Sequence, residues 1–363
     1  MASQSRILIV LTVLLPLSVL LHRFGASEEW IFISSIASII PLAILLGTAT
    51  ERLAERLGPS IGALLTALFG NATELIIALI ALRAGLTDIV KASITGSVMA
   101  NLLLALGLSM LIGGLGRQEQ GFSSVIPRVN GTAMTLAVLS ILIPSLSGLS
   151  RVGTAVVRED SIHFSEFVAW ILLIVYALTL LFSLKTHRSL YQPVAELNSG
   201  SNHQNQSTPP LIPWLCTLLV VTIAIAYESE LFVGVVEVVT DRIGLSDVFT
   251  GVILLPLLGG TAEYFTAVSM ARKNKMDLSV SVALSSTLLI ALLVVPVLVL
   301  TGPMMGHPFD LNFGIYEVVA VIFAVVVSNL VSLDGRSDWL EGILLLAAYA
   351  ILAAGFFFQI TPV

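Results

Sequence analysis

Apolar residues form long runs in this chain, separated by short polar stretches, and the lengths of the runs predict membrane spans. A helix needs about 20 apolar residues to cross the hydrocarbon core of a bilayer. We interpret eleven apolar stretches, which range from 15 to 29 residues, as spans: 7–21, 30–49, 61–82, 89–112, 132–146, 164–184, 211–239, 248–270, 278–300, 315–331 and 340–358. The first also fits the core of a signal peptide, but we interpret it as a spanning helix because only a loose cleavage-site pattern follows it at residues 25–27.

One hydrophilic stretch interrupts the apolar pattern near the middle of the chain. Residues 185–210 are rich in Ser, Asn, Gln and His and contain Pro193, Pro209 and Pro210, which is typical of a flexible linker. We therefore predict an all-α polytopic membrane protein with four parts: an N-terminal helix (1–27), five spans (28–184), a cytoplasmic linker (185–210) and five further spans (211–363).

A short motif with a central carboxylate occurs once in each group of five spans. Residues 70–74 read Gly-Asn-Ala-Thr-Glu, and residues 259–263, at an offset of 189, read Gly-Gly-Thr-Ala-Glu. The same offset pairs Arg83 with Arg272, Asp88 with Asp277 and Ser97 with Ser286. Because five is an odd number of spans, two such repeats must have opposite orientations in the membrane. Inverted repeats that meet at a mid-membrane site are typical of secondary transporters.

Composition supports this class of protein. Hydrophobic residues make up 56% of the chain and charged residues 11%, and the mean hydropathy is +1.00, so a soluble fold would lack the polar surface to cover itself. The net charge of −6 comes from scattered residues, and no basic patch suggests nucleic-acid binding. The single cysteine, Cys216, excludes an intramolecular disulfide.

Loop charges predict the orientation. With the N-terminus inside, the inner loops carry eleven Lys and Arg residues, namely Arg6, Arg52, Arg56, Arg117, Arg128, Lys185, Arg188, Arg272, Lys273, Lys275 and Arg336. The outer loops carry six, namely Arg23, Arg83, Lys91, Arg151, Arg158 and Arg242. The positive-inside rule therefore predicts a cytoplasmic N-terminus and linker and an outer C-terminus.

The motif chemistry suggests a binding site for a hard cation and for protons. A charged carboxylate in the membrane is costly and usually marks an ion path. Asn71 and Glu74 share one helix face, while the motif glycines, Gly70, Gly259 and Gly260, allow close helix approach or a local break. Oxygen ligands of this kind suit calcium. We predict that Glu74 and Glu263 bind the metal ion and protons in competition, together with the further polar residues Asn71, Ser97, Asn101 and Ser286.

Other interpretations of these residues remain open. A buried Glu can be a structural hydrogen-bonding residue, and Ser97, Asn101 and Ser286 can serve helix packing. Glu230 could line a vestibule or mark an exposed helix end, and the same choice applies to Glu51, for which an exposed end is the simpler interpretation.

Several stretches resemble the calcium/proton exchangers (CAX) of the calcium:cation antiporter superfamily. They are residues 68–76, 96–104, 271–278 and 333–342, and the resemblance covers essentially the whole chain. It implies eleven helices, of which the first is unpaired and the others form two inverted five-helix repeats. It also implies that Glu74 and Glu263 bind the cation and exchange it for protons, and that the second and seventh spans slide as gates.

The second repeat departs from the pattern of that family. The family usually has Asn at Gly260, His at Tyr264 and Gln near Leu288 and Leu289. With these polar groups missing, manganese, sodium or potassium could replace or accompany calcium. The linker has one acid, Glu196, where relatives often have an acidic helix, and the short N-terminus suggests a microbial plasma membrane.

Three classes of function remain in competition. We favour a secondary active antiporter that exchanges cytoplasmic Ca²⁺ for protons. A channel or uniporter would conduct cations without a pH gradient, and an intramembrane enzyme would use the two acids as an acid/base pair. The enzyme is disfavoured because the sequence has no His-Glu-x-x-His or Gly-x-Ser-x-Gly motif. We expect no cofactor; the oligomeric state stays open.

Overall fold

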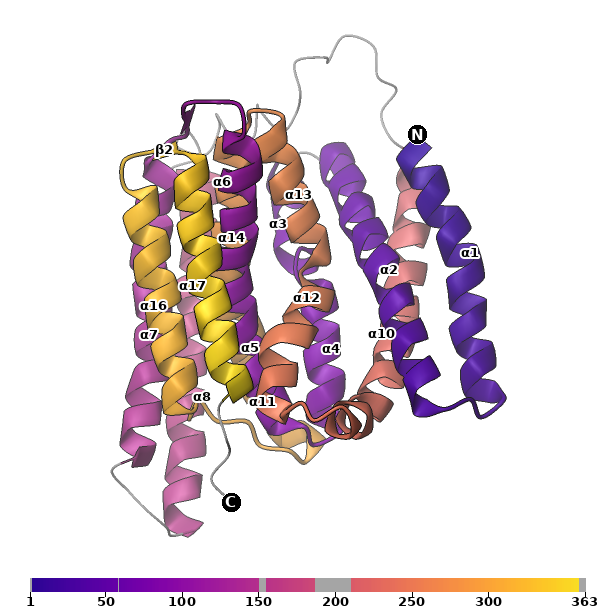
Figure 1. Ribbon diagram of the computed structural model, residues 1–363. Coiled ribbons are helices and arrows are strands. Elements are labelled where there is room, and N and C mark those ends of the chain that lie inside the picture. Colours follow the sequence, from indigo (N-terminus) through magenta and orange to yellow (C-terminus); the bar gives the residue numbers. More distant parts are fainter. Residues whose placement is uncertain (1, 58, 150–154, 187–209, 359–363) are drawn as a thin grey trace.

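The computed structural model describes residues 2–57, 59–149, 155–186 and 210–358, and they form a bundle of helices (Figure 1). The first half contains α1 (Ala2–Arg23), α2 (Glu28–Leu57), α3 (Pro59–Phe69), α4 (Ala72–Arg83), α5 (Thr87–Met99), α6 (Leu106–Gly114), α7 (Val125–Leu149) and α8 (Ala155–Leu181). The second half contains α10 (Leu211–Arg242), α11 (Asp247–Phe249), α12 (Leu255–Gly259), α13 (Thr261–Arg272), α14 (Met276–Leu289), α15 (Val295–Thr301), α16 (Ile315–Ser332) and α17 (Trp339–Phe358).

The prediction of a helical membrane protein is confirmed, while its finer count is not. In the described part of the chain, eight helices are long and apolar enough to span a membrane, or nine if the bent pair 247–259 and 261–272 counts as one. Helix α1 and the broken pair α3/α4 occupy the remaining two predicted spans, so the count of eleven stays a prediction. Most of the predicted linker, 187–209, lies outside the described residues.

Two short strands are the exception to the all-helical structure. Strands β1 (Gln120–Gly121) and β2 (Arg336–Ser337) pair antiparallel. They join the loop after α6 to the loop before α17, at the end of the bundle where the N-terminus lies (Figure 1).

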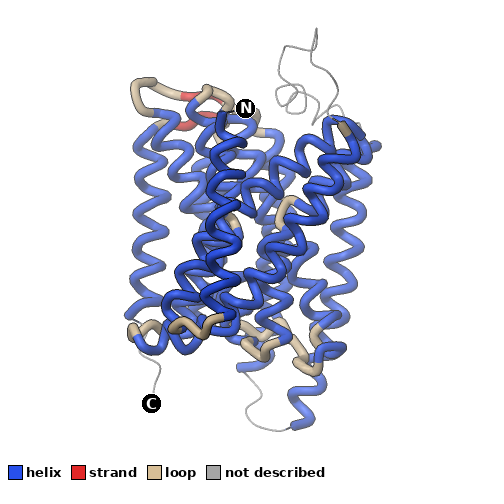
Figure 2. Tube along the Cα trace, turned by 90° about the vertical axis from the view of Figure 1, so that its right-hand side faces the viewer, coloured by secondary structure: helices blue, strands red, loops and turns tan. Residues whose placement is uncertain are grey.

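Helix breaks recur at corresponding places in the two halves. Helices α4 and α13 begin and end 189 residues apart, and each follows an interruption at the motif glycines. The α12/α13 pair bends by 61° at Gly260. Helices α5 and α14 continue into π-helical turns, η1 (Ala100–Ala105) and η4 (Ile290–Val294), and a third, η3 (Thr250–Leu254), precedes α12. Figure 2 shows loop segments inside the bundle, away from its two ends.

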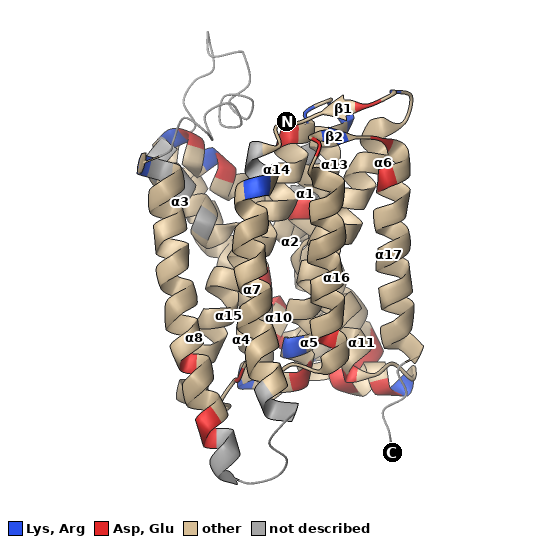
Figure 3. Ribbon diagram, turned by 90° about the vertical axis from the view of Figure 1, so that its left-hand side faces the viewer, with Lys and Arg blue, Asp and Glu red and all other residues tan. Residues whose placement is uncertain are grey.

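Small residues hold the centre of the bundle together. A Cβ atom on Gly96 of α5 would lie 2.0 Å from the carbonyl oxygen of Val252 in η3, and one on Gly251 would lie 2.5 Å from Cβ of Ala92. Glycine at both positions therefore lets the two segments pack backbone to backbone, as small residues do between membrane helices. Charged residues, in contrast, gather mostly at the two ends of the bundle (Figure 3).

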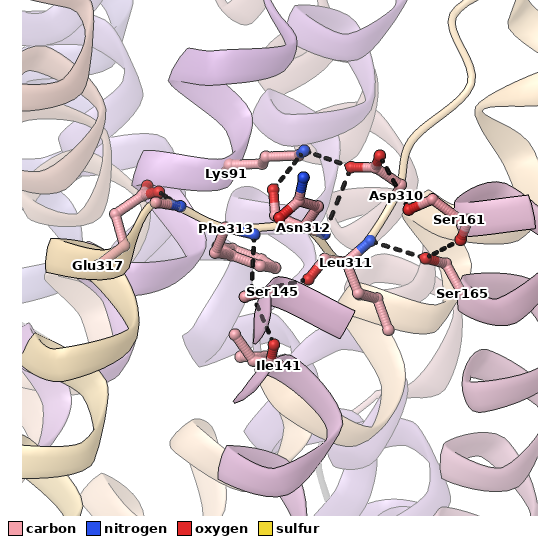
Figure 4. Close-up of polar contacts among 11 residues, drawn as sticks. Lys91, Ile141, Ser145, Ser161, Ser165, Asp310, Leu311, Asn312, Phe313 and Glu317 are labelled. Atoms are coloured by element: carbon pink, nitrogen blue, oxygen red, sulfur yellow. Dashed lines mark hydrogen bonds and ion pairs between the residues drawn. The ribbon is translucent and has the colours of Figure 1, made fainter. Parts of the chain in front are cut away.

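The loop before α16 forms an ion pair and hydrogen bonds with three helices from the first half (Figure 4). The Lys91 ammonium of α5 pairs with Asp310 and donates to the carbonyl oxygen of Asn312 at 2.8 Å. Two backbone amides of the loop donate to buried serine hydroxyls, both at 2.9 Å: Leu311 to Ser165 of α8 and Phe313 to Ser145 of α7. These contacts fix the end of the bundle opposite the β1/β2 pair.

Candidate functional site

Glu74 lies in the first turn of α4, directly after the break in the span. Its side chain is buried, with the residue 8% exposed. Asn71 precedes the helix, and its Nδ2 donates to Oε2 of Glu74 at 2.7 Å. The free backbone amides of a helix N-terminus favour a negative group there. The break at Gly70 and Asn71 therefore places a carboxylate at the start of a helix inside the bundle.

Side chains from both halves of the chain meet around Glu74. From α5, the Ser97 hydroxyl donates to Oε1 of Glu74 at 3.1 Å. From α14, the Ser286 hydroxyl accepts hydrogen bonds from Nδ2 of Asn71 at 2.7 Å and of Asn101 at 2.9 Å. Five of the six residues predicted to bind cations and protons thus form one hydrogen-bonded cluster, and all five are buried.

Asn101 brings an unused oxygen to this cluster. Its side chain is fully buried, and its Oδ1 atom has no hydrogen-bond partner among the described residues. The residue lies in the π-helical turn η1, and such turns often occur at functional sites because they free backbone groups. A buried polar atom without a partner is costly, so this oxygen is a candidate ligand.

Gly70 and Gly259, the first glycine of each motif, differ in what surrounds them. A Cβ atom on Gly259 would come within 2.4 Å of Cγ of Glu74, so glycine at this position leaves the space that the Glu74 side chain occupies. A Cβ atom on Gly70 would meet Leu289 Cδ1 at 4.0 Å, which is ordinary contact, and the Thr66 carbonyl at 2.6 Å. Gly70 thus permits the helix break, whereas Gly259 permits the approach of the two halves.

Glu263 is the one predicted site residue that forms no hydrogen bond to the cluster among the described residues. It lies in the first turn of α13, the counterpart of the position of Glu74 in α4. Its Oε2 atom is buried and has no hydrogen-bond partner in the described part of the chain. The Glu74 and Glu263 carboxylates are close enough to interact electrostatically. Two carboxylates with few donors between them form a region that favours positive charge.

Tyr264 explains why glycine occupies position 260. The Tyr264 hydroxyl donates to the carbonyl oxygen of Pro256 at 2.9 Å, across the break between α12 and α13. A Cβ atom on Gly260 would lie 2.4 Å from that hydroxyl oxygen. The Tyr264 hydroxyl therefore occupies the space where the Cβ atom of an asparagine at position 260 would lie. The two departures from the family pattern, Gly260 and Tyr264, thus depend on each other.

The two proposed vestibule residues lie outside this cluster. Glu51 is exposed near the end of α2. Glu230 of α10 forms an ion pair of 2.7 Å with Arg83, and both side chains are 61% exposed. In the described part of the chain, neither side chain forms a hydrogen bond with the central cluster, so their role in an ion path stays a prediction.

The structure also buries a carboxylate that the sequence pattern did not single out. Glu228 of α10 is fully buried and accepts a hydrogen bond from Ser18 of α1, while its Oε2 atom has no partner among the described residues. From the sequence alone, Glu228 and Glu230 are equally good candidates for burial, because both lie near the middle of the same apolar helix. Ser18, one of two hydroxyl residues in the first span, was a weak signal for such a partner.

No group of three or more His, Cys, Asp and Glu side chains with the geometry of a metal site occurs among the described residues. A cation held by Glu74 and Glu263 would therefore need neutral oxygens for its other ligands. Amide and hydroxyl oxygens of the cluster and the carbonyls freed at the helix breaks have the chemistry that hard cations prefer.

Comparison with known proteins gives the family. The chain matches the sodium/calcium exchanger protein family over residues 28–185 and 213–358. It is 49% identical over 369 residues to the Ca²⁺/H⁺ antiporter of Aphanothece halophytica, covering 99% of this chain and 98% of the relative. It is 47% identical over 374 residues to the Ca²⁺/H⁺ antiporter of Synechocystis, covering 100% of each.

A solved structure agrees with the sequence relatives. The structure of native YfkE superposes with a TM-score of 0.82 at 37% identity, over 97% of this chain and 99% of that one. The family match covers both halves of the bundle, including both carboxylate motifs. The chain belongs to the sodium/calcium exchanger family.

Proposed function

We propose that this protein is a secondary active antiporter that exchanges Ca²⁺ for protons at a mid-membrane site built on Glu74 and Glu263. The observation that carries the proposal is the buried cluster in which Glu74 contacts Asn71 and Ser97, with Ser286 from the other half of the chain adjoining it. The relatives named Ca²⁺/H⁺ antiporter support the choice of ions.

Charge balance is the first argument for exchange. Two carboxylates neutralise one divalent cation, and two protons neutralise the same carboxylates when the cation leaves. An uncompensated pair of charges in the membrane interior is costly. Each carboxylate therefore holds either its share of the cation or a proton, and the two ligands compete.

The amide groups supply the second argument. In the described arrangement, the Nδ2 atoms of Asn71 and Asn101 point at oxygen acceptors. A cation needs oxygen ligands, so its entry requires these amides to turn their oxygens toward it. The same side chains can thus serve the protonated site as donors and the cation-loaded site as ligands.

The sparse second half-site leaves the selectivity open to test. Glu263 has no hydrogen-bonding donor corresponding to Asn71, because residue 260 is glycine and the Tyr264 hydroxyl is engaged by Pro256. Calcium takes six to eight oxygen ligands, and a site with fewer neutral ligands discriminates less strongly in its favour. This is the argument for manganese, sodium or potassium as further substrates.

The orientation belongs to the same proposal. The excess of Lys and Arg in the loops at one end supports a cytoplasmic N-terminus and an outer C-terminus. The membrane proposed is a microbial plasma membrane. The exchanger would then use inward proton flow to export cytoplasmic Ca²⁺.

The experiment that tests this function uses the purified chain in proteoliposomes with an imposed proton gradient. Calcium, manganese, sodium and potassium are added separately, and gradient collapse is followed with a pH-sensitive dye. We expect calcium to collapse the gradient for the wild type and not for Glu74→Gln or Glu263→Gln. Glu317→Gln is the matched control, because Glu317 is a buried carboxylate that accepts a hydrogen bond from the Gly314 amide, outside the cluster. Normal exchange by Glu263→Gln would overturn the two-carboxylate model, and cation flux that needs no pH gradient would indicate a channel.

A further inference from the structure

A groove runs between α7 and α16, remote from the carboxylate cluster. Its volume is about 510 Å³, and it begins at the start of α7, the end of that helix nearest β1. Its lining includes Arg128, Thr135, Leu136 and Leu139 of α7 and Asn329 and Ser332 of α16. None of them takes part in the proposed exchange.

The groove is polar and basic at one end and apolar at the other. Arg128 lies in the first turn of α7, whereas Leu139 lies eleven residues further along the same helix, or about 16 Å at 1.5 Å per residue. That distance is about half of the hydrocarbon thickness of a bilayer. The groove therefore extends from headgroup depth toward the membrane centre.

The charge at the polar end is not neutralised within the described chain. Arg128 is exposed, and its guanidinium group has no carboxylate within ion-pair distance among the described residues. The charged residues that follow α16 have other partners. Asp334 accepts a hydrogen bond from the Arg336 backbone amide, and the Arg336 guanidinium pairs with Glu119. Arg128 thus presents a free cation at the mouth of the groove.

A buried hydroxyl at the same end also lacks a partner among the described residues. Ser332, 1% exposed, lines the groove, and its hydroxyl has no hydrogen-bond partner in the described part of the chain. Asn329 of α16 lies against Gly131 of α7, where a Cβ atom would come within 2.8 Å of the Asn329 Oδ1 atom. Arg128 and Ser332 both line the groove, and a guanidinium group together with a hydroxyl donor can bind a phosphate oxygen.

The apolar end continues onto the outer surface of the bundle. Leu139 is 46% exposed. An occupant therefore needs an anionic head and a long apolar tail to match both ends.

We propose that this groove binds one anionic membrane phospholipid, with its phosphate at Arg128 and Ser332 and an acyl chain along Leu136 and Leu139. Basic pockets between spanning helices recognise anionic headgroups in this way. A free phosphate lacks the tail, and a zwitterionic lipid brings its own cation next to Arg128.

The test uses native mass spectrometry of the full chain purified in detergent, with phosphatidylglycerol or phosphatidylcholine added in equal excess. We expect one phosphatidylglycerol to stay bound under conditions that remove phosphatidylcholine. Arg128→Gln should lower this retention about tenfold, the loss expected for one charge-assisted contact, and Arg128→Lys should keep most of it. Thr135→Trp, which fills the groove and leaves Arg128 in place, should also release the lipid.

Arg56→Gln is the matched control, because Arg56 is exposed at the end of α2 and does not line the groove. Equal thermal midpoints for the variants would show that folding is unaffected. The proposal is overturned if Arg128→Gln retains phosphatidylglycerol as the wild type does, if phosphatidylcholine is held equally, or if glycerol phosphate competes as well as the whole lipid. If the protein is a dimer, and Arg128→Gln dissociates it without changing lipid retention, then a second copy of the chain occupies the groove and the lipid proposal is wrong.

Discussion

A Cβ atom on Gly259 would lie 2.4 Å from Cγ of Glu74, so this glycine of the second motif leaves the space that the glutamate side chain of the first motif occupies. Gly259→Ala should therefore displace the Glu74 side chain and lower calcium-driven proton exchange by at least about tenfold. The measurement is gradient collapse in proteoliposomes. Gly234→Ala is the control, since nothing lies within 4 Å of a Cβ atom there. Equal exchange by the two variants would mean that the motifs do not depend on this contact.

Asn71 should contribute more to cation binding than Ser97. Its amide contacts both Glu74 and Ser286 at 2.7 Å, whereas the Ser97 hydroxyl contacts Glu74 at 3.1 Å. We expect Asn71→Ala to raise the calcium concentration for half-maximal exchange by about tenfold or more, and Ser97→Ala by less, because Asn71→Ala removes two hydrogen bonds and an amide oxygen. Calcium titrations of proton release in proteoliposomes compare the two. The reverse order would argue against Asn71 as a ligand.

Gly260 and Tyr264 should behave as a coupled pair. Gly260→Ala places a methyl group against the Tyr264 ring, so it should reduce both the thermal midpoint and the exchange rate. In a Tyr264→Ala background, the same substitution should cost much less. A double-mutant cycle on the thermal midpoint measures this coupling. Additive effects of the two substitutions would contradict the contact.

The loop contacts of Lys91 should matter for stability. The Lys91 and Asp310 side chains are 14% and 20% exposed. Lys91→Met leaves Asp310 without its charged partner and should cost about 2 kcal/mol, visible as a lower thermal midpoint. Arg83→Gln, which breaks a pair with Glu230 at 61% exposure on both sides, should change stability by less than about 1 kcal/mol. Equal losses in the two variants would show that burial does not set the strength of these pairs.

The sequence was informative where rare residues interrupt apolar runs. Glu74 stood out because a carboxylate inside a span is costly, and the repeat at an offset of 189 drew attention to Ser286 as the counterpart of Ser97. The helix breaks at both motifs could be expected from their glycines. These features depend on local chemistry and spacing, which a sequence carries.

Other parts of the site depend on contacts that spacing does not encode. Ser286 contacts Asn71 and Asn101 of the first half rather than Glu263 of its own half. The use of Tyr264 as a partner for Pro256 requires the bend between α12 and α13. Burial of Glu228 against Ser18 depends on where α1 packs. Each of these follows from tertiary packing, so the sequence alone left them undetermined.

The most direct test of the central claim is the calcium dissociation constant of the purified protein at a series of pH values, with the protons released on binding counted in weak buffer. If cation and protons compete for Glu74 and Glu263, a fall in pH protonates the carboxylates and weakens calcium binding, and each ion releases up to about two protons. Glu74→Gln or Glu263→Gln should bind weakly and release fewer protons. A dissociation constant that is the same at every pH, or undiminished proton release by both variants, would contradict exchange at this pair of carboxylates.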